Sequence, residues 1–159
     1  MMNKKKTTFG QLILTYLKQG ISPELLSLSI ALGAVIGILP VLGSTTLLCA
    51  AAAILLRLNL PVIQLSNYLV YPLQIALLIP FVRLGAFLFQ VEAPPFSIET
   101  LGALFQQNFW GTVASFFETI LYAVAAWLLV SIPLFVVLYA LSLSVLKRIG
   151  PLAAAKALR

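Results

Sequence analysis

A succession of apolar segments between Ser22 and Leu146 is the feature that most limits how this chain can fold. Hydrophobic residues make up 62% of the 159 residues, and charged residues make up only 9%. A soluble domain carries about 25% charged residues, because its surface must be polar. This chain has too few polar side chains to cover itself, so we expect lipid to cover it. The sequence therefore predicts an all-α, polytopic integral membrane protein with a single membrane domain.

The basic residues lie mainly at the two ends of the chain, and the net charge is +6. They flank the apolar segments, which is the distribution expected from the positive-inside rule rather than from nucleic-acid binding. The connection 91–108 contains two glutamates and no Lys or Arg, which indicates the outer side. We therefore expect a multi-pass protein of the bacterial inner membrane with both termini in the cytoplasm. The terminal bases are Lys4, Lys5, Lys6, Lys18, Lys147, Arg148, Lys156 and Arg159.

The predicted organisation has three parts. Residues 1–21 form a basic N-terminus with an amphipathic surface helix, in which apolar residues recur at helical spacing. Residues 22–148 form the membrane domain, and residues 149–159 form a cytoplasmic tail. Within the membrane domain, about four membrane-embedded helices are predicted, over residues 22–39, 44–58, 61–90 and 116–146.

The first two helices form a short hairpin. Ser29, Gly33 and Gly37 recur every four residues, so one face of the first helix is narrow enough for close packing, and we expect the second helix to pack there. The second helix is about 22 Å long, whereas the hydrocarbon core is about 30 Å thick. The hairpin is therefore expected to be tilted, to thin the bilayer or to be re-entrant.

The third helix is interrupted by Pro72 and Pro80. Each proline removes one backbone hydrogen bond and frees a carbonyl, which is tolerated in a membrane only where protein or water covers it. A polar stripe on this helix either lines a hydrophilic path or forms structural hydrogen bonds with neighbouring helices. Its members are Gln64, Asn67, Tyr71 and Gln74.

Two further groups are candidates for binding a substrate. The corner Gly43-Ser44-Thr45 opens a helix N-terminus, which attracts anions, although ordinary capping by Ser44 explains the same residues. Arg83 and Glu118 are predicted at similar depth and are expected to face each other, because unpaired charges in a membrane are costly. The alternatives are that each extends separately to the outer headgroups, or that Arg83 holds an anionic headgroup or substrate.

Enzymatic chemistry has little support in this composition. The chain has no histidine, four acidic residues and one cysteine, Cys49. No catalytic dyad or triad and no Cys/His metal cluster can be assembled from them. We therefore expect no enzyme activity, no cofactor, no metal and no internal disulfide.

Several motifs stand out between Ser22 and Gly85, namely Ser22-Pro23, Ala31-Leu32-Gly33, Gly37, Pro40, Gly43, Thr45, Leu58-Asn59-Leu60-Pro61, Pro72 and Gly85. Together they resemble domain-of-unknown-function family 2062, a group of small bacterial inner-membrane proteins. The resemblance supports a membrane protein and implies no biochemical activity. One position departs from the family pattern, because Tyr71 precedes Pro72 where the family usually has asparagine, and Asn67 lies one turn earlier on the same face.

Broken helices, a polar stripe and two intramembrane charges together favour a transporter-like protein. It would move a polar or anionic small molecule, or a lipid headgroup, across the bilayer. The alternative is a non-catalytic assembly or scaffold subunit that docks another membrane protein through its small-residue hairpin. The expected partners are the lipid bilayer, an anionic lipid or polar substrate, and either a second copy or another membrane protein.

Overall fold

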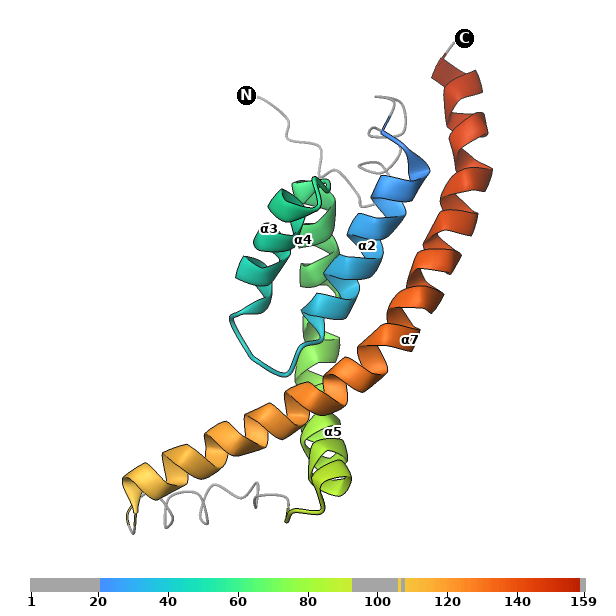
Figure 1. Cartoon of the computed structure of the whole chain (residues 1–159). Helices are drawn as coiled ribbons and strands as arrows, with labels where there is room; N and C mark the ends of the chain where they lie inside the picture. The colour runs from blue at the N-terminus through green and yellow to red at the C-terminus, as the bar shows by residue number, and fades with distance from the viewer. Residues whose placement is uncertain (1–20, 93–105, 107, 158–159) are drawn as a thin grey trace, which may run out of the picture.

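The computed structural model describes residues 21–92, 106 and 108–157, and within these residues the regular elements are all α-helices. The predicted surface helix of the N-terminus and most of the acidic connection lie outside them. The elements in chain order are α2 (Pro23–Gly37), α3 (Thr45–Leu55), α4 (Leu60–Leu69), α5 (Tyr71–Phe89) and α7 (Phe109–Ala157) (Figure 1).

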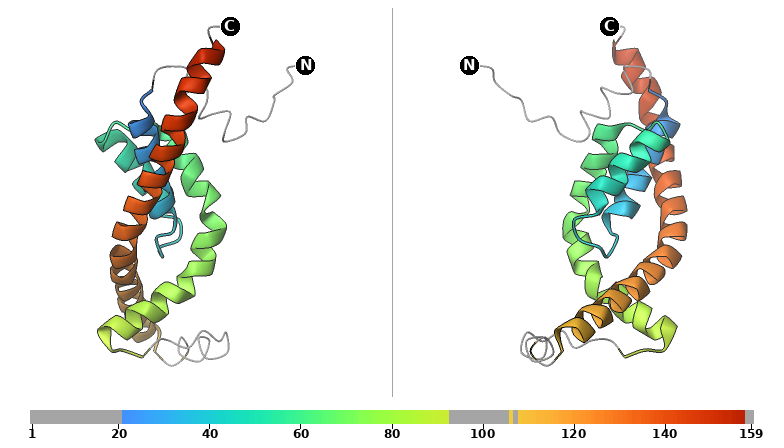
Figure 2. Two further views of the ribbon diagram at one scale, coloured as in Figure 1. Left: turned by 90° about the vertical axis from the view of Figure 1, so that its right-hand side faces the viewer. Right: turned by 60° about the vertical axis from the view of Figure 1, so that its left-hand side comes forward.

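The five helices divide the molecule into two halves. Helices α2, α3 and α4 pack side by side in one half, and α5 continues from α4 into the other half, as Figures 1 and 2 show. The long helix α7 bends as it runs past both halves, crossing α5 first and then following α2. The turn between α2 and α3 therefore lies near the middle of the molecule, level with the junction of α4 and α5.

Among the residues that the structure describes, two helices are long and apolar enough to cross a membrane. They are α5, over Tyr71–Phe89, and the segment Trp110–Ile149 of α7. Helices α2 and α3 are apolar but short, at 15 and 11 residues, which correspond to about 22 and 16 Å. The all-helical prediction is confirmed for the part of the chain that the structure describes, whereas only two of the four predicted segments have spanning length.

The last two predicted helices have different bounds in the structure. The predicted helix 61–90 divides at Val70 into α4 and α5, and Pro72 lies in the first turn of α5, where no backbone N–H is needed. Helix α7 extends beyond the predicted range 116–146 at both ends. Its backbone stays helical through Pro151 to Ala157, in the predicted tail 149–159, because the alanine-rich sequence there favours a helix.

The prediction that α3 packs against the narrow face of α2 was wrong. A Cβ atom at Gly33 would overlap the carbonyl oxygen of Ile63 in α4 and lie 2.8 Å from Cβ of Ser66. A Cβ atom at Gly37 would overlap a methyl group of Val70. The glycines therefore pack against α4 rather than α3.

Helix α3 contacts another part of the same bundle. Its buried residues Cys49 and Ala53 join a cluster with Leu58 and Ile63, against which the half-buried Leu32 of α2 also packs. The two faces of α2 thus contact different helices, and α4 takes the closer position because only the glycine face allows the backbones to approach.

The end of the bundle where α2 begins is held by polar and apolar contacts with α7. Nζ of Lys147 lies 3.0 Å from Oε1 of Glu24. The hydrogen bond from Lys147 holds the pKa of Glu24 below its ordinary value. Glu24 belongs to the first turn of α2, outside the two helices of spanning length. Beneath this ion pair, Leu26, Val62 and Leu146 form a buried cluster. The start of α2, the start of α4 and the last third of α7 therefore meet at one end.

The Asn59-Leu60-Pro61 sequence begins α4 and ties it to α2. The side-chain oxygen of Asn59 accepts from the N–H of Val62 at 3.1 Å, while the N–H of Asn59 donates to Oγ of Ser29 at 3.2 Å. Asn59 therefore caps α4, and Pro61 occupies the first turn, where its missing N–H costs nothing.

Asn59→Ala is expected to lower the free energy of unfolding in detergent by about 1 kcal/mol, because the N-cap hydrogen bond is lost. Asn59→Asp is the matched control, since a carboxylate also caps a helix N-terminus. Thermal unfolding followed by circular dichroism measures both variants. Equal losses for the two substitutions would contradict a capping role.

Candidate functional site

The tip of the α2–α3 hairpin is inserted between α5 and α7 near the middle of the molecule. Ile38, which is only 3% exposed, packs in one cluster with Phe81 and Val82 of α5 and with Ala123 and Ala126 of α7. These contacts place the C-terminal end of α2 against the two helices of spanning length. We define the hairpin tip as residues 38–46.

Two long polar side chains donate to carbonyls at this end of α2. Nε2 of Gln74 donates to the carbonyl of Leu39 at 2.6 Å, and Nε1 of Trp127 donates to the carbonyl of Val35 at 3.0 Å. The last carbonyls of a helix have no partner within the helix, and in an apolar interior they must find one elsewhere. Trp127 thus provides a partner for one of the last carbonyls of α2. Leu39 follows the C-cap of α2, and its carbonyl also accepts from the N–H of Val41 at 2.8 Å, so Gln74 adds a second hydrogen bond there. Together the two side chains attach the hairpin to α5 and α7.

One atom of this arrangement has no partner. Gln74 is 1% exposed, and its Oε1 makes no hydrogen bond with any residue that the structure describes. The Oε1 atom of Gln64 is also buried and likewise accepts no hydrogen bond from the described residues. A buried acceptor without a donor costs about 1–3 kcal/mol, so a water molecule or a polar ligand near either atom would be stabilising.

The first turn of α3 lacks the cap that the sequence suggested. Ser44 has helical backbone angles, and its Oγ donates to the carbonyl of Val41 at 2.9 Å instead of accepting from α3. Gly43 has a φ of +84°, and no heavy atom lies within 4 Å of the position of a Cβ there. The N-terminal end of α3 is therefore an uncapped helix terminus beside open space, with Thr45 buried and Thr46 exposed.

The four residues of the polar stripe do not share one environment. Gln64 donates from Nε2 to the carbonyl of Thr46 at 2.9 Å, which joins α4 to the hairpin tip. Asn67 is buried beside Gly37, and Gln74 binds Leu39 as described above. Tyr71 is 48% exposed. Three of the four residues therefore contact the hairpin, and Tyr71 lies apart from them.

The expected ion pair between Arg83 and Glu118 is not present. Both side chains are exposed, and among the described residues the ion pair is the one between Glu24 and Lys147. The face of α5 that packs on α7 contains Val82, Gly85 and other small or apolar residues, so Arg83 points away from it. Along the crossing of the two helices, Gly85 contacts Tyr122 and the ring of Phe89 packs against that of Tyr122, so Glu118 lies near the end of α5 rather than opposite Arg83.

Comparison with protein families identifies residues 6–150 as a match to the family described as "Uncharacterized protein conserved in bacteria (DUF2062)". The chain belongs to this family. No curated protein and no solved structure matches it. The match confirms the resemblance that the sequence motifs suggested, and it adds no biochemical activity.

The motifs that resemble this uncharacterised bacterial family have identifiable structural roles in this member. Gly33 and Gly37 allow α2 to contact α4, and Gly85 allows α5 to cross α7, where a Cβ would lie 2.5 Å from the carbonyl oxygen of Tyr122. Asn59 caps α4, as described above. Trp127, which the sequence analysis did not single out, has an equally central place. A tryptophan within an apolar segment is a usable signal for it, because a buried indole N–H needs an acceptor.

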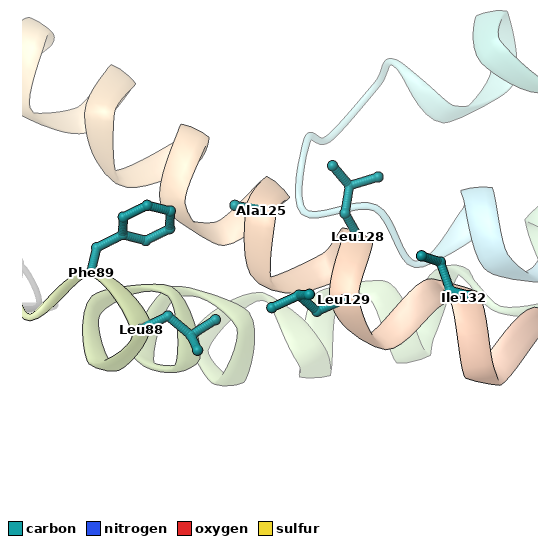
Figure 3. Close-up of a pocket in the computed structure, with 6 residues that line it drawn as sticks. All are labelled: Leu88, Phe89, Ala125, Leu128, Leu129 and Ile132. Carbon is teal, nitrogen blue, oxygen red and sulfur yellow. The ribbon is translucent and has the colours of Figure 1, made fainter.

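Apolar grooves lie on the described surface in at least two places. One, of about 350 Å³, lies where α5 crosses α7 and is lined by apolar residues that include Phe89, Ala125 and Leu129 (Figure 3). A second, of about 520 Å³, lies between α2, α3 and Trp127. Neither groove is lined by a polar side chain, so each fits an apolar group rather than a polar substrate.

Proposed function

We propose that this protein is a polytopic protein of the bacterial inner membrane in which α4 followed by α5 forms one crossing of the bilayer and α7 forms another. The apolar surface of α5 and α7 supports the proposal, because only 28% and 17% of their most apolar segments are buried. The core helix of a soluble protein would be mostly buried. Exposed apolar side chains are also found on the short helices, including Leu47 at 75% and Leu55 at 80%.

In this proposal the α2–α3 hairpin is re-entrant. It enters from the cytoplasmic side, where Glu24 and Lys147 lie, and ends near the middle of the bilayer. Two contacts support this depth. Trp127, which donates to the carbonyl of Val35, lies far from both ends of α7, and Gln74, which donates to the carbonyl of Leu39, lies in the first turn of α5, where α5 continues from α4. The short lengths of α2 and α3, about 22 and 16 Å, also agree with a hairpin that does not cross the whole hydrocarbon core of about 30 Å.

Sidedness of labelling tests the re-entrant arrangement. In a Cys49→Ala background, a bulky membrane-impermeant thiol reagent added from outside is expected to label Val91→Cys, which follows α5, and not Leu42→Cys at the hairpin tip. Both positions are exposed in the folded chain, so burial within the protein does not explain a difference. Rapid outside labelling of Leu42→Cys would mean that the hairpin spans the membrane.

The function that this arrangement supports best is transport of a polar or anionic small molecule or of a lipid headgroup. The observation that carries it is the uncapped N-terminus of α3 at the hairpin tip, beside the exposed Thr46. In broken-helix transporters such termini bind anionic groups near the bilayer midplane. An uncapped terminus in an apolar medium is costly, so a hairpin tip at that depth requires water or a ligand.

The scaffold function has less support. The scaffold hypothesis requires the small-residue face of the hairpin to be free for a partner protein. Gly33 and Gly37 of that face are instead in contact with α4. The transport proposal is therefore placed first.

Thr46→Asp tests the transport proposal directly. Thr46 is in the first turn of α3, so a carboxylate there would interact with the helix terminus itself and compete with an anionic substrate. Efflux of small anions and flipping of labelled phospholipid are measured in proteoliposomes. We expect the transported species to move about tenfold more slowly in Thr46→Asp, because a hydrogen bond to a charged group contributes about 1.5 kcal/mol.

Thr46→Asn is the matched control, since it has nearly the same size as the aspartate without its charge, and it is expected to transport at close to the wild-type rate. The thermal unfolding midpoint of both variants in detergent should equal or exceed that of the wild type. Equal flux in liposomes with and without the wild-type protein would overturn the proposal.

A further inference from the structure

The larger of the two grooves has a shape that suits one lipid chain. We call it the hairpin groove, and it is lined by Ile36 and Leu39 of α2, by Leu48 and Leu55 of α3, and by Trp127 of α7, among other apolar residues. It follows α3, whose 11 residues are about 16 Å long, close to half the thickness of a hydrocarbon core. A groove of this length matches the acyl chain of a lipid from one leaflet.

An unusual residue stands at the end of this groove. Arg57 comes directly after the lining residue Leu56 and has a φ of +54°, in the left-handed region. It ends α3 in a Schellman motif, in which the N–H of Leu58 donates to the carbonyl of Ala53 at 2.9 Å. Glycine is the usual residue at this position, since any side chain there is strained.

Arg57 also carries a charge that nothing in the described part of the chain neutralises. Its side chain is exposed, and no carboxylate among the described residues forms an ion pair with it. It lies at the same end of the bundle as Glu24 and Lys147, because α3 ends where α2 and α4 begin (Figure 1). A strained, unpaired cation thus stands where an apolar groove of one-leaflet length meets the membrane surface.

From this juxtaposition we propose that the hairpin groove and Arg57 form a binding site for an anionic phospholipid of the cytoplasmic leaflet. The acyl chain lies along α3 toward Trp127, and the phosphate of the headgroup binds the Arg57 guanidinium, a charge-assisted pairing that arginine forms well. The site rests on the membrane insertion proposed above, and it does not depend on whether the protein transports anything. Charge complementarity selects a lipid rather than an uncharged helix as the occupant.

Thermal unfolding of the full chain in detergent, with and without added lipid, tests the site. Phosphatidylglycerol is expected to raise the unfolding midpoint of the wild type by about 5 °C when it is about 100-fold above its dissociation constant, and phosphatidylcholine is expected to raise it much less. Arg57→Gly should raise the midpoint without lipid by about 3 °C, because it relieves the backbone strain, and should abolish the difference between the two lipids. Arg57→Lys should keep most of that difference.

The chain offers two matched controls. Gln90 is the other non-glycine residue with positive φ in the described ranges, so Gln90→Gly should also stabilise the fold but leave the lipid difference unchanged. Ala51→Trp fills the hairpin groove and should reduce the response to phosphatidylglycerol, whereas Leu47→Trp, on α3 but outside the groove lining, should not.

Any one of three results would overturn the proposed lipid site. One is an Arg57→Gly protein that still distinguishes the two lipids. Another is an equal shift with inorganic phosphate alone, which would indicate a free anion instead of a lipid. A third is cross-linking of Ala51→Cys in the groove to a second copy of the chain under conditions where the lipid response is absent. If the lipid response holds while proteoliposome flux is absent, only the transport proposal fails.

Discussion

Gly33→Val is expected to lower the free energy of unfolding by about 3 kcal/mol, and this is the largest packing effect that we expect in the chain. Any Cβ at Gly33 meets the backbone carbonyl of Ile63, which is part of α4 and cannot rotate away as a flexible side chain can. The two helices would have to separate along their whole contact. Thermal unfolding in detergent, or the loss of helical signal in a denaturing-detergent titration, measures the effect.

The same substitution at an exposed position provides the control for the lower helix propensity of valine. Ala140→Val lies on the exposed face of α7 and should change the free energy of unfolding by less than about 1 kcal/mol. Gly43→Ala should also be mild, since open space surrounds Gly43 and only its backbone conformation opposes the change. A Gly33→Val protein as stable as Ala140→Val would show that α2 and α4 do not pack as described.

Gln74→Glu is expected to have a comparable effect through chemistry rather than volume. The amide nitrogen that donates to the carbonyl of Leu39 would become an oxygen, and two acceptors would face each other in a site where Gln74 is 1% exposed. An uncompensated buried charge typically costs about 3 kcal/mol or more. We expect a smaller loss at about pH 5 than at about pH 8, because only the protonated carboxyl can donate to Leu39.

Gln74→Met separates the loss of the hydrogen bond from the introduction of charge. Methionine has a similar length, removes the donor and also removes the unpartnered Oε1, so we expect a loss of about 1 kcal/mol or less with no dependence on pH. If Gln74→Glu and Gln74→Met unfold at the same midpoint at both pH values, then Gln74 is in contact with water and does not hold the hairpin.

The sequence alone predicted the class of fold and most of the helix ends. Helices α2, α3 and α4 begin within one residue of the predicted positions 22, 44 and 61, because the signals that start a helix act within one turn. Pro72 separates α4 from α5 for an equally local reason. The family was also recognisable, since its motifs are local signals of this kind. The end of α7 was the local error, where a glycine-proline pair did not stop an alanine-rich helix.

Partners across the fold were less predictable. The narrow face of α2 was assigned to α3, the next helix in the chain, whereas α4 occupies it; sequence order suggests a neighbour, but close backbone contact requires a matching face. Arg83 and Glu118 were paired by their predicted depth, whereas both side chains are exposed and form no ion pair with each other. Trp127 was not identified, because nothing near it in the sequence indicates that the carbonyl of Val35 needs a donor.

What the sequence by itself determined is therefore the set of elements: apolar helices with their caps and breaks. Only the tertiary structure decided that the hairpin tip is inserted between α5 and α7, that Gln74 holds it while one oxygen stays unpartnered, and that Arg57 ends α3 beside an apolar groove. The physical reason is range. Capping, proline breaks and hydropathy act over a few residues, whereas these contacts join atoms about 30 to 90 positions apart, and helix packing alone determines which faces meet.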